Sequence, residues 1–261
     1  MKTCCAAYSY RRELTSGAMK LEDFIETCWR LGLDGVELTA YYFESLEEDY
    51  LRRLKRLAVD YGLDIRATAV GNDFCIPDPD ARAEQVKLVK KWVDVSLYLG
   101  APILRVFAGR VPEGCSEDEA FSWAVGAFKE CADYASTKGV VLALENHGGI
   151  TSTSDRVVRI VEAVDSEWFR VNLDVGNYRV DPYREIEETA RYAVHVHAKF
   201  LDVRPDGSDG KIDHAKILDI LRKTGYKGYL SIEYEGEEDA TSAVPRAAKF
   251  LKRLIKGDEN R

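Results

Sequence analysis

The sequence lacks the features that would place this protein in or across a membrane. No stretch approaches the run of about 18 apolar residues that a membrane-spanning helix needs. The N-terminal residues Met1 to Tyr8 lack the apolar core, roughly 7–15 residues long, that a secretory signal carries. The six cysteines include no Cys-x-x-Cys pair, so we interpret them as small core residues in a reducing compartment rather than as disulfides or thiolate ligands. Together these absences predict a cytoplasmic protein.

Positive charge is also in deficit. The formal net charge is −8 and the isoelectric point is near 5.2. Nucleic acids and anionic membranes attract basic surfaces, so neither is expected as a partner. The chain also lacks a Gly-x-Gly-x-x-Gly turn after an early strand, which argues against an open, dinucleotide-binding sheet.

What the sequence does contain is a repeated unit of strand followed by helix. Short apolar runs alternate with segments whose apolar residues follow a helical period, and glycines at 32, 62, 100, 139 and 225 end five of these segments. A polar loop is expected at 9–18. The expected strands are 3–7, 35–38, 63–70, 103–107, 140–145, 169–174, 193–198 and 229–233. The expected helices are 21–31, 45–61, 80–99, 116–138, 153–164, one starting at 182, 212–224 and 240–255.

Eight such units without a linker predict one closed (β/α)8 barrel, a TIM barrel, spanning residues 1–261 as a single domain. The apolar content of 46% is sufficient for the core of such a barrel. The charged tail at 256–261 is expected to fray.

Four of the expected strands end on side chains that can bind a metal ion. Glu145, Asp174, His197 and Glu233 close strands five to eight, and parallel strands in a barrel direct these ends to one face. Three carboxylates in one pocket repel each other, and a divalent cation would remove that cost. Oxygen and imidazole ligands suit Mn²⁺, Mg²⁺, Co²⁺ or Zn²⁺. The alternative is that each residue is a surface loop residue or half of a salt bridge.

The seventh strand carries two histidines and a lysine on the same face, because side chains alternate along a strand. His197 is nearer the carboxyl end and is the expected ligand, whereas His195 is expected to be a buried core histidine. Lys199 either contacts a substrate oxygen or pairs with Glu233 or Asp202.

These motifs carry a family resemblance. Leu144-Glu-Asn-His-Gly148, Leu173-Asp-Val-Gly-Asn177, His195-Val-His-Ala-Lys199 and Ser231-Ile-Glu-Tyr-Glu-Gly236 resemble the xylose isomerase-like barrel superfamily, in particular its sugar phosphate isomerase/epimerase branch. Gly35-Val-Glu-Leu38 is similar too. The resemblance implies a (β/α)8 fold and one divalent metal ion held by Glu145, Asp174, His197 and Glu233.

The resemblance and the chemistry of the residues together imply a proton-transfer reaction. An ion chelated by the carbonyl and a neighbouring hydroxyl of a sugar would stabilise an enediolate. Glu145 and Glu233 would then remove and return a proton on opposite faces of the substrate carbon. Epimerisation of a ketose, aldose–ketose isomerisation and dehydration remain open at this point.

Further residues near the strand ends are expected to bind the substrate. His147 lies beside a glycine pair, and Asn177 stands where many relatives have histidine, which leaves it hydrogen bonding rather than proton relay. Glu37 is expected either to pair with a charge inside the barrel or to accept a sugar hydroxyl. The full set is Glu37, Asn72, Arg105, His147, Asn177 and Lys199.

Two other classes of function fit the sequence less well. The related abasic-site nuclease uses three zinc ions and many histidines, which disagrees with the four histidines and the acidic charge of this chain. A sugar-binding subunit without turnover disagrees with the intact pair of Glu145 and Glu233. The expected partner is therefore a small-molecule carbohydrate, and Asp206 and Asp209 in the glycine-rich loop at 206–211 favour a neutral polyol. A homo-oligomer is compatible with the sequence.

Overall fold

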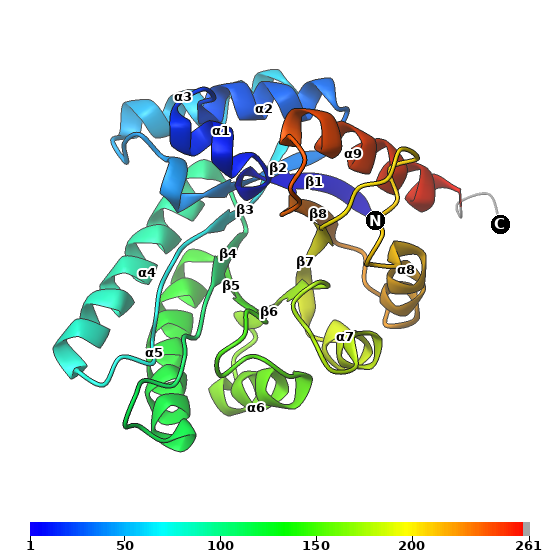
Figure 1. Cartoon of the computed structure of the whole chain (residues 1–261). Coiled ribbons are helices and arrows are strands. Elements are labelled where there is room, and N and C mark those ends of the chain that lie inside the picture. Colours follow the sequence, from blue (N-terminus) through cyan, green and yellow to red (C-terminus); the bar gives the residue numbers. More distant parts are fainter. Residues whose placement is uncertain (258–261) are drawn as a thin grey trace.

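Eight parallel strands close into one barrel in the computed structural model, which describes residues 1–257 (Figure 1). Each strand pairs with its neighbours in the sequence, and the first pairs with the last. This confirms the predicted (β/α)8 fold. The strands are β1 (Lys2–Ala6), β2 (Gly35–Thr39), β3 (Asp64–Ala69), β4 (Ile103–Val106), β5 (Val141–Glu145), β6 (Phe169–Asp174), β7 (Ala193–Phe200) and β8 (Tyr229–Tyr234).

Helices follow the strands and surround the barrel (Figure 1). The principal helices are α2 (Leu21–Arg30), α3 (Glu48–Asp60), α4 (Pro79–Leu99), α5 (Glu117–Lys138), α6 (Ser154–Val164), α7 (Pro182–Ala190), α8 (His214–Lys223) and α9 (Ala240–Lys256). Shorter turns are the 3₁₀ segments η1 (Ala7–Tyr10) and η2 (Ala40–Tyr42) and the six-residue α1 (Arg11–Ser16). Among residues 1–257, no helix has both the length and the apolar character needed to cross a bilayer.

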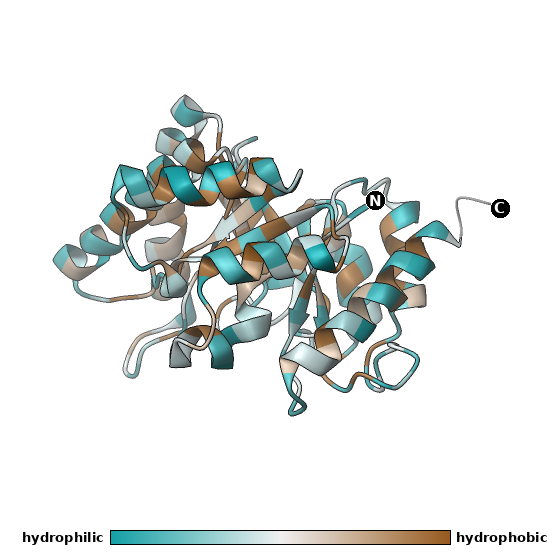
Figure 2. Ribbon diagram, turned by 90° about the horizontal axis from the view of Figure 1, so that it is seen from above, coloured by the Kyte–Doolittle hydropathy of each residue, from teal (hydrophilic) through white to brown (hydrophobic). Residues whose placement is uncertain are grey.

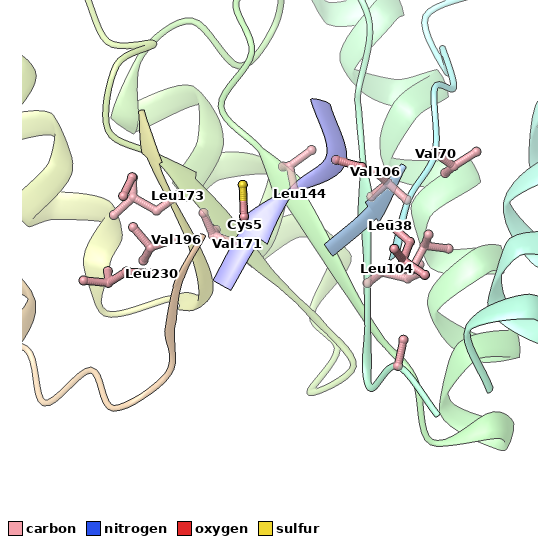
Figure 3. Packing of buried hydrophobic residues seen from close by; sticks show 14 of the residues in the cluster. Cys5, Leu38, Val70, Leu104, Val106, Leu144, Val171, Leu173, Val196 and Leu230 are labelled. Atoms are coloured by element: carbon pink, nitrogen blue, oxygen red, sulfur yellow. The ribbon is translucent and has the colours of Figure 1, made fainter. Parts of the chain in front are cut away.

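The layer between strands and helices holds the main core. Leu104, Leu144 and Val196 lie on β4, β5 and β7 (Figure 3) and belong to one buried apolar cluster with helix residues such as Phe24 and Phe128. The helices mix polar and apolar residues along their length (Figure 2), as expected when one side packs on the barrel and the other is solvated. Because strand side chains alternate, burying this layer turns every second residue toward the barrel axis.

The inside of the barrel is mostly polar toward its carboxyl end. Among the described residues, Ala67, Ile103 and Ala143 form a small apolar cluster separate from the main core. Arg105 and Glu145 follow two positions after Ile103 and Ala143, and both are buried. The strand period therefore places charged side chains directly above an apolar floor.

Some predicted boundaries were wrong. The stretch predicted as a loop at 9–18 contains the end of η1 and all of α1. No residue of α1 is buried, so this helix has no apolar period that could have predicted it. Tertiary contacts hold it instead: the Arg11 guanidinium donates to Tyr234 O at 2.6 Å. Strand β7 extends to Phe200, two residues past its predicted end, so His197 lies inside the strand. Lys256 is the last residue of α9 and Gly257 is its C-cap, whereas residues 258–261 of the predicted tail lie outside the described residues.

The cysteines behave as packing residues, as predicted. All six are free, and all except Cys115 are buried. Burial raises the pKa of Cys75 and of Cys131 to about 12. A thiol reagent such as DTNB is therefore expected to label only Cys115 in the folded protein, and all six thiols after denaturation. Rapid labelling of two or more thiols in the native state would contradict this packing.

Candidate active site

The four predicted ligands converge inside the carboxyl end of the barrel. The distance from His197 Nδ1 is 3.3 Å to Glu233 Oε1, 3.7 Å to Glu145 Oε2 and 3.9 Å to Asp174 Oδ2. Glu145, Asp174 and His197 offer ligand atoms that all lie within 4.8 Å of one another. All four side chains are buried. They are therefore not surface loop residues, although Glu145, Asp174 and Glu233 also take part in salt bridges, which is the other half of the alternative.

The other side of the His197 ring faces Glu37 on β2. Glu37 Oε1 lies 2.9 Å from His197 Nε2, Glu37 Oε2 lies 2.9 Å from His195 Nε2, and Ser231 Oγ donates to the same oxygen at 2.8 Å. Burial by itself would raise the pKa of Glu37, but His197 and His195 outweigh it and hold that pKa well below its ordinary value. With three donors on a buried carboxylate, the structure supports the barrel-partner role of Glu37 over the sugar contact.

His195 lies one layer deeper, as the core position predicted for it requires. It is fully buried. Glu37, His195 and His197 are also close enough to form a second metal-binding group. However, both imidazole–carboxylate distances are those of ordinary hydrogen bonds, which account for this cluster without an ion.

Arg105 neutralises one of the converging carboxylates. Its Nε lies 3.1 Å from Glu145 Oε2, and its NH1 donates to Val70 O at 3.0 Å. The guanidinium carbon lies 3.9 Å from the ring centroid of Phe107. These contacts fix Arg105 on three sides, so it holds Glu145 in place within the site.

Lys199 neutralises the carboxylates on the opposite side. Its Nζ lies 2.8 Å from Asp174 Oδ2 and 3.1 Å from Glu233 Oε2. It also donates at 3.1 Å to Asn177 Oδ1 and to Glu235 Oε1. Burial by itself would lower the pKa of Lys199, but Glu233 and Asp174 raise it above its ordinary value. Of the two predicted salt-bridge partners, Glu233 is confirmed.

Three asparagines hold the carboxylates in position. Asn177 Nδ2 donates to Asp174 Oδ2 at 2.9 Å, and Asn172 Nδ2 donates to Glu145 Oε2 at 3.3 Å. The Asn146 amide pairs with the backbone of Asp174, accepting from its N at 2.8 Å and donating to its O at 2.9 Å. The Asn146 contacts therefore fix the carboxyl end of β5 relative to the carboxyl end of β6.

Three residues at the site, Asn172, Ser231 and Glu235, were not predicted from the sequence. Asn172 stands two residues before Asp174, and Ser231 and Glu235 stand two residues either side of Glu233. The two-residue strand period could have placed all three on the inner face.

The remaining predicted substrate contacts form a separate group at the mouth. Asn72, Phe107 and His147 line a cavity of about 220 Å³, and the ring centroids of Phe107 and His147 are 4.4 Å apart. The Asn72 amide is paired with the Phe107 backbone, donating to its O at 2.7 Å and accepting from its N at 2.9 Å. Because Phe107 contacts Arg105, this cavity adjoins the carboxylate cluster.

The charge balance of the cluster fits a divalent cation. The cluster contains four buried carboxylates and two buried cations, which leaves two negative charges when the imidazoles are neutral. The carboxylates are those of Glu37, Glu145, Asp174 and Glu233, and the cations are Arg105 and Lys199. Within residues 1–257, His197 Nδ1 has no hydrogen-bond partner although three carboxylates surround it. A mixed oxygen and imidazole shell of this kind suits Mn²⁺, Mg²⁺, Co²⁺ or Zn²⁺. One such ion would neutralise the cluster and give Nδ1 a partner.

Fold and site define a (β/α)8 barrel protein with a buried carboxylate–imidazole centre at the carboxyl ends of its strands. The family model described as xylose isomerase-like TIM barrel matches residues 25–254. The chain belongs to this family.

Similar proteins include an uncharacterised archaeal protein and an isomerase. Protein MJ1311 of Methanocaldococcus jannaschii is 23% identical over 255 residues, covering 91% of this chain and 85% of that protein. The 2-oxo-tetronate isomerase of Haemophilus influenzae is 22% identical over 181 residues, covering 66% of this chain and 70% of the isomerase.

Solved structures with the same fold include sugar epimerases. L-ribulose 3-epimerase superposes with a TM-score of 0.83 at 19% identity, covering 99% of this chain and 96% of that one. D-psicose 3-epimerase of Clostridium cellulolyticum H10, solved with D-tagatose, gives 0.82 at 18% identity, covering 100% and 99%.

Proposed function

We propose that this protein is a divalent-metal-dependent isomerase or epimerase of a small sugar, keto-sugar or related polyol. The convergence of Glu145, Asp174 and Glu233 around the unpartnered Nδ1 of His197 carries this proposal. These four residues would hold the ion. The 2-oxo-tetronate isomerase and the 3-epimerases similar to this chain act on small keto compounds, which supports the same reaction class here.

The two glutamates are placed to move protons. When bound, the ion would polarise the substrate carbonyl and stabilise negative charge on its oxygen. Glu145 approaches the centre from β5 and Glu233 from β8, with β6 and β7 between them. One glutamate would remove the proton next to the carbonyl, and the other would return a proton to the opposite face or to the adjacent carbon. Arg105 pairs with Glu145 and Lys199 pairs with Glu233, and these contacts orient the two carboxylates.

The other polar groups would bind and orient the substrate. His147 and Asn72 line the cavity beside the centre, and His147 is exposed at its rim. Asn177 contacts both Asp174 and Glu145, so its amide lies where a substrate hydroxyl would approach. Phe107 would supply an apolar wall.

A proton-exchange screen tests the proposed function. The protein, loaded with Mn²⁺, is incubated in D₂O with a panel of ketoses, ketoacids and inososes, and each substrate is analysed by NMR and mass spectrometry. Deuterium at a carbon next to a carbonyl, with formation of an epimer or isomer, is expected for one compound class. Loss of water from an inosose or keto-sugar would assign a dehydratase instead, and binding without exchange would assign a sugar-binding subunit.

Replacing Glu37 with glutamine is expected to weaken Mn²⁺ binding about 10- to 100-fold, as is usual when the partner of a metal-binding histidine is removed. The Glu37 carboxylate holds a proton on His197 Nε2 and so leaves Nδ1 free for the ion. Isothermal titration calorimetry measures the affinity, and ¹⁵N chemical shifts of the imidazole report its tautomer. Glu187→Gln, an exposed change on α7, is the control. Unchanged affinity and tautomer in Glu37→Gln would remove this positioning role.

A further inference from the structure

We propose that Lys199 is an internal counter-ion that opposes binding of the divalent ion, and that its ion pairs with Asp174 and Glu233 break when the ion binds. This inference builds on the proposed function, because it concerns the same cluster. It assigns Lys199 a role in setting the metal affinity in addition to its predicted contact with substrate.

The contacts of the ammonium group place it in competition with an ion. Lys199 Nζ lies 2.8 Å from Asp174 Oδ2 and 3.1 Å from Glu233 Oε2, so it draws on two of the four proposed ligands. The side chain is 3% exposed, so water screens these contacts poorly. A second cation that needs the same oxygen lone pairs meets both repulsion and competition for ligands.

The backbone of the β6–α7 connection is shaped around the lysine stem. A Cβ atom added at Gly176 would lie 2.6 Å from Lys199 Cδ and 2.8 Å from Lys199 Cγ. The absence of a side chain at Gly176 therefore lets the lysine lie against the loop with its ammonium over the carboxylates. An alanine at this position would push the lysine stem away.

Two further hydrogen-bond partners can hold the Lys199 ammonium after its ion pairs with the proposed ligands break. Glu235 Oε1 and Asn177 Oδ1 each accept from its Nζ at 3.1 Å, and neither residue is a proposed ligand. The Glu235 side chain is 32% exposed and lies at the mouth, beyond the buried Glu233. A small movement that keeps these two contacts would release Asp174 and Glu233 and leave the positive charge beside the substrate cavity.

Metal titration of variants tests this proposal without any measurement of turnover. Metal-free wild type, Lys199→Met and the exposed control Lys129→Met are titrated with Mn²⁺ by calorimetry, and their thermal unfolding is followed with and without Mn²⁺. Lys199→Met is expected to bind Mn²⁺ at least tenfold more tightly than wild type. The metal-free form of Lys199→Met is expected to unfold at a lower temperature than metal-free wild type, and Mn²⁺ is expected to raise its unfolding temperature by more. Lys129→Met is expected to behave as wild type in both measurements. Gly176→Ala, which displaces the lysine without removing it, is expected to shift the affinity in the same direction and replaces Lys199→Met if that variant does not fold.

A double-mutant cycle tests where the lysine goes. Glu235→Gln is expected to weaken Mn²⁺ binding in wild type and to have no effect in the Lys199→Met background, because Glu235 acts through Lys199. Equal effects in both backgrounds would overturn the transfer to Glu235. If wild type binds Mn²⁺ and Lys199→Met binds it no more tightly, the counter-ion role is wrong while the proposed function stands. If none of the proteins binds Mn²⁺, the proposed function and the counter-ion role are both wrong. If only Lys199→Met binds Mn²⁺, the result supports the counter-ion role.

Discussion

Glu145→Gln and Glu233→Gln are each expected to reduce formation of the epimer or isomer from substrate by at least about 100-fold, because a positioned general base contributes roughly 10²–10⁴-fold. Glutamine has nearly the shape of glutamate but cannot take up a proton at neutral pH. Each variant also loses a negative charge that would help hold the ion, so product formation and exchange are both measured at saturating Mn²⁺, with the occupancy determined by calorimetry. Glu187→Gln is the matched control, because it removes an exposed carboxylate from α7.

The same variants distinguish one base from two. If each glutamate serves one face of the substrate carbon, Glu145→Gln will still exchange the proton on the face served by Glu233, and the reverse holds for Glu233→Gln. If a single glutamate moves the proton between adjacent carbons, one variant loses all exchange and the other keeps most of it. Formation of the epimer or isomer at the wild-type rate in either variant, with the ion bound, would remove that glutamate from the mechanism.

Removal of divalent ions is expected to abolish turnover completely, with recovery on addition of Mn²⁺, Mg²⁺, Co²⁺ or Zn²⁺. Without the ion, the buried carboxylates Glu145, Asp174 and Glu233 would lose the positive charge that they bind together, and the substrate carbonyl would lose its electrophile. The fold should persist, because Arg105 and Lys199 still pair with these groups. Activity and residual metal content are followed together after chelation and dialysis.

Thermal unfolding supplies an independent measure of the same site. An ion that binds only the folded state adds about 2.7 kcal/mol to the free energy of unfolding at a hundred times its dissociation constant. Asp174→Asn should lose most of this gain, because the ion loses a charged ligand. Full activity at a metal content well below one ion per chain would contradict metal dependence.

The sequence determined the architecture and the positions of the principal site residues. Repeated strand and helix periods with helix-ending glycines specified the barrel. Parallel strands then direct their carboxyl ends to one face, so Glu145, Asp174 and Glu233 had to converge wherever the barrel closed. The position of His197 nearer the carboxyl end of its strand distinguished it from His195, and the two-residue period of strands could have identified Asn172 as well. These properties depend on local periodicity and chain direction alone.

The tertiary structure decided which charges pair inside the barrel. Glu37 and His195 are 158 positions apart, and their contact depends on how β2 and β7 are staggered across the ring. The pairing of Lys199 with Asp174 depends on the bare backbone of Gly176 and on the extension of β7 to Phe200, neither of which has a sequence period. The small helix α1 likewise depends on Arg11 reaching the end of β8. Contacts of this kind arise only after the barrel has closed, because the partners belong to strands whose relative register is set by the packing of the whole ring.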